Sequence, residues 1–116
     1  MINLLTETTY MIERINKKTE DIEFIGSYDG EYHCTWEEFI NLADFEYSSG
    51  YGSHEIPLDL VIVFKDKSFL HRDEYDGSEW WDYEIIPTIN KNPKKIMNLI
   101  SKETIGSITI NSINKS

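Results

Sequence analysis

The chain has 116 residues, of which 40% are hydrophobic and 13% aromatic, and its formal net charge at neutral pH is −10. This length predicts a single domain over residues 1–116, and the aromatic and aliphatic content excludes a disordered acidic tail. No apolar run approaches the ~20 residues of a membrane-spanning helix, which excludes that class of protein.

The first 34 residues predict a helix followed by a hairpin. Apolar residues recur every three or four positions over 4–18, with basic residues near the end of the segment, as in an amphipathic helix. Residues 22–26 predict a short strand and 27–30 a turn, after which 31–34 return as the partner strand.

Residues 35–58 predict a second helix and a loop. Thr35 and Glu38 have the spacing of a capping box, so we expect a helix to begin here. One face of that helix is apolar and comprises Trp36, Phe39, Ile40 and Ala43. The segment 45–58 contains two glycines, three serines and a proline, which is typical of a loop.

Residues 59–86 predict an antiparallel meander of three strands. The continuous apolar run 60–64 is typical of a central strand covered on both faces. Strands are expected over 69–75 and 80–86, joined by a tight turn at Asp76-Gly77-Ser78.

The last thirty residues predict one more helix and one more strand. Asn92 and Pro93 have the residue types of a helix start, with the helix continuing to about residue 101. Isoleucine alternates with polar residues over 105–113, as in a strand. The chain as a whole is expected to be α+β, an antiparallel sheet with two or three helices on one face.

Negative charge is concentrated in the middle of the chain. Residues 20–84 contain eighteen Asp and Glu against three Lys and Arg, a net charge of −15, whereas both flanks are positive. Such a surface should repel nucleic acid and anionic lipid, and can dock where a basic protein holds phosphates. The alternative is that the acidity only keeps a small protein in solution.

No catalytic, metal or cofactor site is expected from the sequence. One cysteine and three scattered histidines lack the paired spacing of a zinc site, and the lone Cys34 excludes an internal disulfide. Gly50-Tyr51-Gly52 is followed by neither Lys nor a helix start, unlike a phosphate-binding loop. Together with the missing secretory signal, the lone cysteine favours a cytoplasmic protein.

Trp80 and Trp81 are adjacent, so on a strand they face opposite sides of the sheet. We expect Trp81 to face the core and Trp80 to lie among the acidic residues. An aromatic side chain ringed by charge is a candidate anchor for a partner protein.

The octapeptide EYDGSEWW at 74–81 follows the apolar strand 59–63, the TWEEF helix start at 35–39 and the glycine-containing loop 50–52. This pattern, over roughly residues 35–86, resembles a block of small phage and prophage proteins. Short acidic proteins of this kind are similar to anti-CRISPR proteins, several families of which imitate DNA and fill a nucleic-acid channel of the effector. The resemblance implies a non-enzymatic inhibitor and defines no functional residues to carry over.

The sequence therefore predicts an inhibitor, acting in the cytoplasm of an infected bacterium, that binds a basic nucleic-acid-handling protein such as a CRISPR effector. The predicted partner-binding residues are Asp29, Glu31, Glu37, Glu38, Asp44, Glu46, Tyr51, Asp73, Glu74, Asp76, Glu79, Trp80, Asp82 and Glu84. Two alternatives remain open: an interaction module without a defence role that uses the aromatic loop 45–58, and a small enzyme with carboxylate chemistry.

Overall fold

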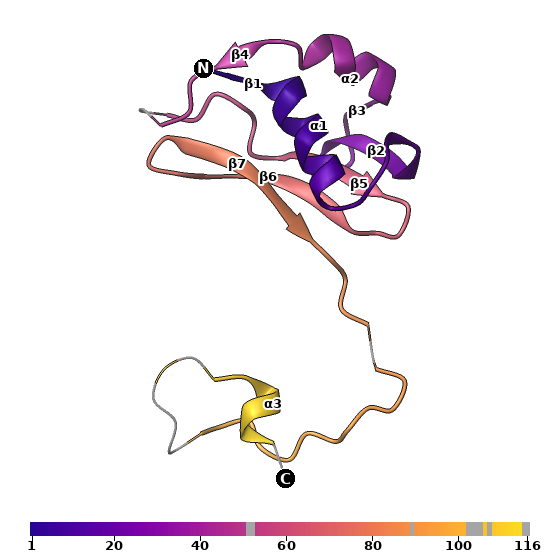
Figure 1. The fold of residues 1–116 in the computed structure, drawn as a ribbon, viewed down its shortest axis with the longest axis vertical. Helices are drawn as coiled ribbons and strands as arrows, with labels where there is room; N and C mark the ends of the chain where they lie inside the picture. Colours follow the sequence, from indigo (N-terminus) through magenta and orange to yellow (C-terminus); the bar gives the residue numbers. More distant parts are fainter. Residues whose placement is uncertain (51–52, 89, 102–105, 107, 115–116) are drawn as a thin grey trace. The chain divides into compact units, whose positions relative to one another are not determined.

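The computed structural model describes residues 1–50, 53–88, 90–101, 106 and 108–114 (Figure 1). The chain divides into two compact units, residues 1–86 and residues 87–116, and each is described by itself. The expectation of one domain over 1–116 stays a prediction. None of the helices in the described part of the chain is long and apolar enough to cross a membrane.

The first unit has the α+β fold that the sequence predicts, with a five-stranded antiparallel sheet in the order β3-β2-β5-β6-β7 and a two-stranded sheet of β1 and β4. The elements are β1 (Ile2–Asn3), α1 (Leu4–Arg14), the 3-10 helix η1 (Thr19–Asp21), β2 (Ile22–Ser27), β3 (His33–Cys34), α2 (Trp36–Leu42), β4 (Glu46–Tyr47), β5 (Leu60–Phe64), β6 (Phe69–Tyr75) and β7 (Ser78–Glu84).

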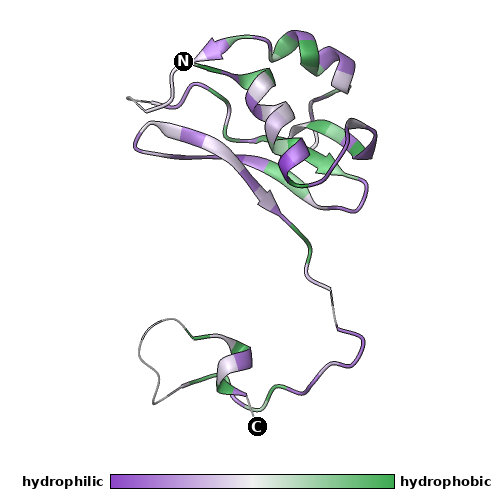
Figure 2. Ribbon diagram, viewed as in Figure 1, coloured by the Kyte–Doolittle hydropathy of each residue, from purple (hydrophilic) through white to green (hydrophobic). Residues whose placement is uncertain are grey.

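The core lies between one face of the five-stranded sheet and the two helices, which both cover that face in Figure 1. The predicted central strand is confirmed, because β5 lies between β2 and β6, and Ile62 and Phe64 are fully buried. Figure 2 shows the apolar residues of β5 as a green band. Leu4 and Ile12 of α1 and Phe39 of α2 pack on this inner face.

The predicted capping box is confirmed. The Thr35 hydroxyl accepts a hydrogen bond from the Glu38 N–H at 3.1 Å, and the Glu38 carboxylate accepts one from the Thr35 N–H at 2.9 Å. The apolar face of α2 is narrower than expected, since Ile40 is exposed. Helix α1 ends at Arg14, earlier than predicted, because Asn16 adopts a positive φ of 60°.

The hairpin of β6 and β7 turns where the sequence predicts it. Asp76 has a φ of 50° and Gly77 a φ of 86°, the two consecutive positive values that a type I′ turn requires. Strand β7 begins at Ser78 and ends at Glu84, so it lies two residues nearer the turn than the predicted strand 80–86.

Two predictions for the second unit are wrong. Residues 92–101 are not helical, because the backbone N–H groups of Met97 and Asn98 donate to the side-chain oxygen of Asn114. The described part of 105–113 contains no strand, and residues 110–113 form helix α3 (Ile110–Ile113) with Thr109 as its cap. Residues 105 and 107 lie outside the described residues.

Lys17, which follows helix α1, forms an ion pair with Asp66 in the turn between β5 and β6. Together with the Ser68 hydroxyl and N–H, Lys17 holds the pKa of Asp66 well below its usual range. A carboxyl whose pKa is lower in the folded state stabilises the fold above the unfolded-state pKa of about 4, and this contribution is lost as the pH falls.

We therefore expect Asp66→Asn to lower the urea midpoint at about pH 7 and to shrink the loss of stability between about pH 7 and about pH 3. Urea unfolding followed by tryptophan fluorescence measures both quantities. Glu20→Gln, at an exposed residue of η1, is the control and should keep the wild-type pH dependence. An Asp66→Asn protein with the full wild-type pH dependence would contradict this account.

Candidate partner-binding surface

A buried arginine joins β6 to α1, β4 and β7. The Arg72 side chain has no exposed surface, and its guanidinium lies 3.2 Å from the Glu7 carboxylate and 3.6 Å from that of Glu79. It also donates to the Tyr47 hydroxyl at 2.9 Å and lies 4.9 Å from the centre of the Trp81 ring. Burial, followed by the hydrogen bond to Glu7, raises the pKa of Tyr47 to about 12.

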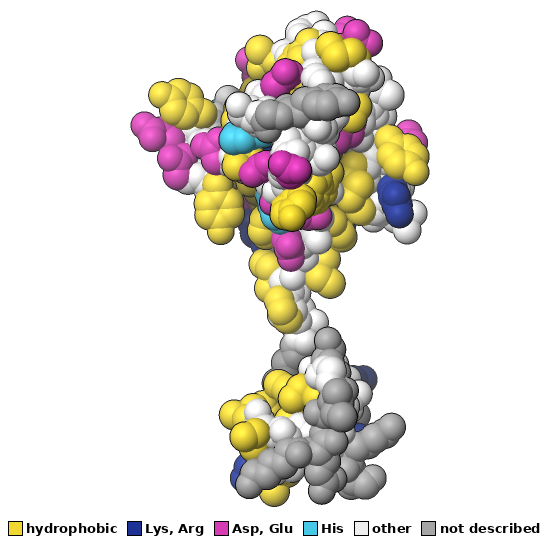
Figure 3. Space-filling model, turned by 90° about the vertical axis from the view of Figure 1, so that its left-hand side faces the viewer, with side chains coloured by type: hydrophobic (Ala, Val, Ile, Leu, Met, Phe, Trp, Pro, Cys, Tyr) yellow, Lys and Arg dark blue, Asp and Glu magenta, His cyan; other side chains and the backbone are white. Residues whose placement is uncertain are grey.

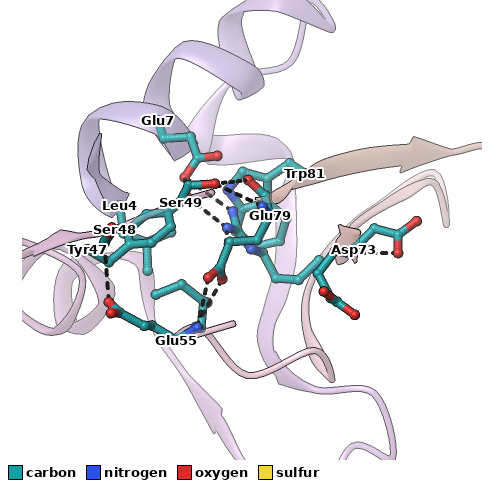
Figure 4. Close-up of polar contacts among 12 residues, drawn as sticks. Leu4, Glu7, Tyr47, Ser48, Ser49, Glu55, Asp73, Glu79 and Trp81 are labelled. Atoms are coloured by element: carbon teal, nitrogen blue, oxygen red, sulfur yellow. Dashed lines mark hydrogen bonds and ion pairs between the residues drawn. The ribbon is translucent and has the colours of Figure 1, made fainter. Parts of the chain in front are cut away.

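Glu79 belongs to this buried cluster, so its assignment to a partner-binding surface is wrong. Its side chain has no exposed surface, and its two oxygens accept the N–H groups of Glu55 at 2.8 Å and Ile56 at 3.0 Å. The physical reason is strand alternation, because Glu79 and Trp81 lie on the same face of β7 and that face is the core. Figure 4 shows Glu79 beside Trp81 and directed toward Glu55.

The opposite face of the hairpin carries the predicted aromatic anchor together with three of the predicted acids. Trp80, Asp82 and Glu84 occupy every second position of β7 and therefore share one face. Asp73 of the neighbouring strand β6 pairs directly with Trp80. The indole N–H of Trp80 donates to Asp82 at 3.0 Å. In Figure 4 the Asp73 side chain points away from the buried cluster. The predicted split, Trp81 inward and Trp80 among the acids, is confirmed.

The two aspartates of this outer face repel one another. Burial raises the pKa of the Asp82 carboxyl, and contact with the Asp73 carboxylate raises it further. His71 of the same face lies opposite Asp82 in the register, and its ring is 3.2 Å from the Glu84 carboxylate. Asp73 and Asp82 therefore form a pair of like charges with no Lys or Arg partner among the described residues.

Two further predicted acids of the hairpin lie off this face. Glu74 pairs with Glu79 across the strands and so lies on the inner side, near the turn and half-buried. Asp76 is exposed within the turn itself. The acids over 73–84 thus do not act as one surface, because alternation divides them between two faces and a turn.

The remaining predicted acids are exposed at other places on the first unit. Asp29, in the β2–β3 turn, accepts from the Ser27 hydroxyl and the Glu31 N–H, and the pKa of its carboxyl is lowered mainly by Ser27. The pKa of Glu38 is lowered mainly by the backbone hydrogen bond from Thr35.

Asp44 and Glu46 lie near the two-stranded sheet, where Asp44 accepts from the Asn3 amide and Glu46 pairs with Asn3 in the register. Glu31 and Glu37 are exposed, and Tyr51 lies outside the described residues.

Three of the six Lys and Arg residues of the first unit form ion pairs with described acids of the same chain. Lys17 pairs with Asp66, Lys67 with Glu23, and Arg72 with the half-buried Glu7 and the buried Glu79. Within the described residues, Asp73 on the outer face of the hairpin and Glu37 of α2 have no ion-pair partner, whereas Glu84 has His71 beside it. Figure 3 shows several acidic side chains beside hydrophobic ones on one side of the first unit.

Two hollows meet at His33 and Cys34. One, of about 340 Å³, is lined by Ile25, Leu60 and Asp59 among others, and the other, of about 370 Å³, by Glu20, Glu23, Trp36 and Glu37. Burial raises the pKa of the Cys34 thiol. No group of three His, Cys, Asp or Glu that could hold a metal ion occurs in the part of the chain that the structure describes.

Sequence reasoning missed two members of the outer face, Phe69 and His71. They follow the same alternation as Asp73 on β6, and their rings lie 5.8 Å apart. Side chains alternate between the two faces of a strand, so in the predicted strand 69–75 both residues share a face with Asp73. That alternation alone predicts that they lie on the same face as Trp80.

Searches of protein-family models, of curated proteins and of solved structures found no match for this chain. The resemblance of residues 35–86 to small phage and prophage proteins, and that of such short acidic chains to anti-CRISPR proteins, therefore stay predictions. The geometry described above carries the functional argument.

Proposed function

We propose that this protein is a non-enzymatic, phage-type inhibitor that binds a basic nucleic-acid-handling protein, such as a CRISPR effector, in the cytoplasm of an infected bacterium. The observation that carries the proposal is the unmatched charge on the first unit. Three of its six Lys and Arg side chains, Lys17, Lys67 and Arg72, are paired with acids of the same chain, while most of its exposed acids have no ion-pair partner among the described residues.

Electrostatics explains why such a surface suits a nucleic-acid channel. A channel lined with Lys and Arg attracts any dense array of negative charge, and carboxylates meet the same side chains as phosphates do. The attraction raises the association rate and selects basic partners over others. Trp80 adds an apolar anchor whose burial would slow dissociation.

An interaction module without a defence role is the second candidate. Three tyrosines, Tyr28, Tyr32 and Tyr75, are each more than 70% exposed, and exposed tyrosines are typical of protein interfaces. An interface of that kind would be insensitive to salt, which separates it from the mimicry proposal.

Removing charge without changing shape tests the proposal. The neutralised variant carries Glu31→Gln, Glu37→Gln, Asp73→Asn, Asp76→Asn and Asp82→Asn. Wild-type protein should block target-DNA binding by at least one of a panel of guide-loaded CRISPR effectors, and the neutralised variant should block it much less. The salt dependence of inhibition should also flatten in the variant, because fewer charged contacts remain to be screened. Gel-shift assays at about 50–500 mM salt measure both effects.

Two controls accompany this experiment. A Glu13→Gln, Glu20→Gln variant loses charge at exposed residues outside the predicted surface and should inhibit as the wild type does. The purified chain alone should not shift DNA, since its surface repels phosphates. Direct, salt-sensitive DNA binding by the isolated protein, or full inhibition by the neutralised variant at every salt concentration, would refute the mimicry proposal.

A further inference from the structure

The inner face of the β6–β7 hairpin, together with Glu7 of α1, holds the guanidinium of a buried arginine. Arg72 lies directly opposite Trp81 in the register, with the guanidinium 4.9 Å from the centre of the indole ring. Carboxylates of Glu7 and Glu79 lie at 3.2 and 3.6 Å. A tryptophan face and two carboxylates thus hold one guanidinium through stacking and charge together.

The outer face of the same hairpin also has a tryptophan and two carboxylates, but no arginine in the described part of the chain lies between them. Trp80 lies directly opposite Asp73, and Asp82 follows two residues along the same face. The Trp80 N–H donates to Asp82 at 3.0 Å, which fixes the indole beside the carboxylate. Among the described residues, the cation–π contacts involve the rings of Phe64, Tyr47 and Trp81 and leave Trp80 without one.

No helix among the described residues of the first unit covers this face, on which Trp80 and Asp82 are half-buried and Asp73 is exposed. Helices α1 and α2 both pack on the other side of the sheet, on the face formed by residues such as Ile62 and Leu70 (Figure 1). Asp73 and Asp82 are like charges close together on this face, and the pKa of Asp82 is raised first by burial and then by Asp73. A cation placed between them would relieve that repulsion, so charge complementarity identifies the occupant as cationic.

We propose that the outer face of the β6–β7 hairpin binds an arginine side chain of the partner, stacked on Trp80 and paired with Asp73 and Asp82. The inference rests on the proposed function, because it assigns the partner's chemistry at one part of the acidic surface. Arginine is preferred over lysine because its planar guanidinium stacks on an indole and bonds two carboxylate oxygens side by side, whereas an ammonium is a compact, strongly hydrated charge.

The probes are an oligoarginine peptide and an oligolysine peptide of equal length, titrated into the isotope-labelled full-length protein. Nuclear magnetic resonance follows the three indole N–H signals, and Trp80→Phe identifies the signal of Trp80. We expect the oligoarginine peptide to shift that signal and to bind about tenfold more tightly than oligolysine. Trp80→Ala should abolish the preference for arginine.

Charge-matched variants test the location. Asp73→Asn with Asp82→Asn removes two charges from the outer face but keeps an oxygen acceptor for the Trp80 N–H and the Glu74 N–H. It should weaken oligoarginine binding about tenfold, whereas Glu13→Gln with Glu20→Gln, at exposed residues outside the predicted surface, should change it by less than about twofold. Equal binding of the two peptides, an unmoved Trp80 signal, or equal losses in the two double variants would overturn the inference.

The inference and the proposed function can fail separately. If the Asp73→Asn, Asp82→Asn protein no longer binds oligoarginine but still blocks the effector as strongly as the wild type, the arginine site is wrong and the inhibitor proposal stands. If the peptide binds as expected but no effector is inhibited, the arginine site is supported and the inhibitor proposal fails.

Discussion

Replacing Glu79 with alanine is expected to lower the free energy of unfolding by about 3–5 kcal/mol, because it removes one partner of a buried ion pair. Arg72 would remain without exposed surface and keep Glu7 as its charged partner, while the Glu55 and Ile56 N–H groups would lose their acceptor. Since a domain of this size has about 5–15 kcal/mol in total, the loss is a large share of its stability. Urea unfolding measures it.

Glu74 provides the matched control, as it lies directly opposite Glu79 on β6 but is only half-buried. Glu74→Ala should change the free energy of unfolding by about 0.5 kcal/mol or less. Replacing Arg72 and Glu79 with leucine and Glu7 with glutamine should together cost less than Glu79→Ala alone, because no unpaired charge is then left beside the core. Equal losses in Glu79→Ala and Glu74→Ala would contradict the buried-pair description.

Phe64→Ala is expected to lower the free energy of unfolding by a similar amount, about 3–5 kcal/mol, through the loss of buried surface and the cavity left behind. Phe64 is fully buried on the central strand, and its ring packs edge-on against Tyr83 at 6.5 Å. Lys17 lies 5.7 Å from the centre of the same ring. The midpoint of urea unfolding should fall accordingly.

Phe45 is the control for this substitution, because the same residue type is 43% exposed there. Phe45→Ala should cost much less, since more than two fifths of its surface already contacts water. If the two alanine variants unfolded at the same urea concentration, the position of Phe64 in the core would be wrong.

Elements whose signals are local could be predicted from the sequence. The Asp76-Gly77 turn, the capping box of Thr35 and Glu38 and the apolar strand 60–64 each depend on a few neighbouring residues, and each appears in the structure. Strands β1 and β4 were missed because they are two residues long and pair only through contacts between distant segments.

The errors come from long-range partners that a local pattern does not contain. Residues 92–101 have a good helix start, but their backbone bonds to Asn114, which no local signal indicates. Glu79 was assigned to the acidic surface because it is charged. Strand alternation instead puts its side chain on the same face as Trp81, two residues along β7. Its partner Arg72 lies on the adjacent strand, and only the register brings the two together.

Strand β7 is the outermost strand of the five-stranded sheet, so one side of its backbone has no neighbouring strand among the described residues. A free edge of this kind can pair with the same edge of another molecule and start aggregation, unless charged side chains oppose it. Asp82 and Glu84 supply like charges along this edge, and the Ser49 hydroxyl accepts the Glu79 N–H nearer the turn. The acidity of the hairpin therefore also keeps two copies of the chain from joining their sheets, whatever partner it binds.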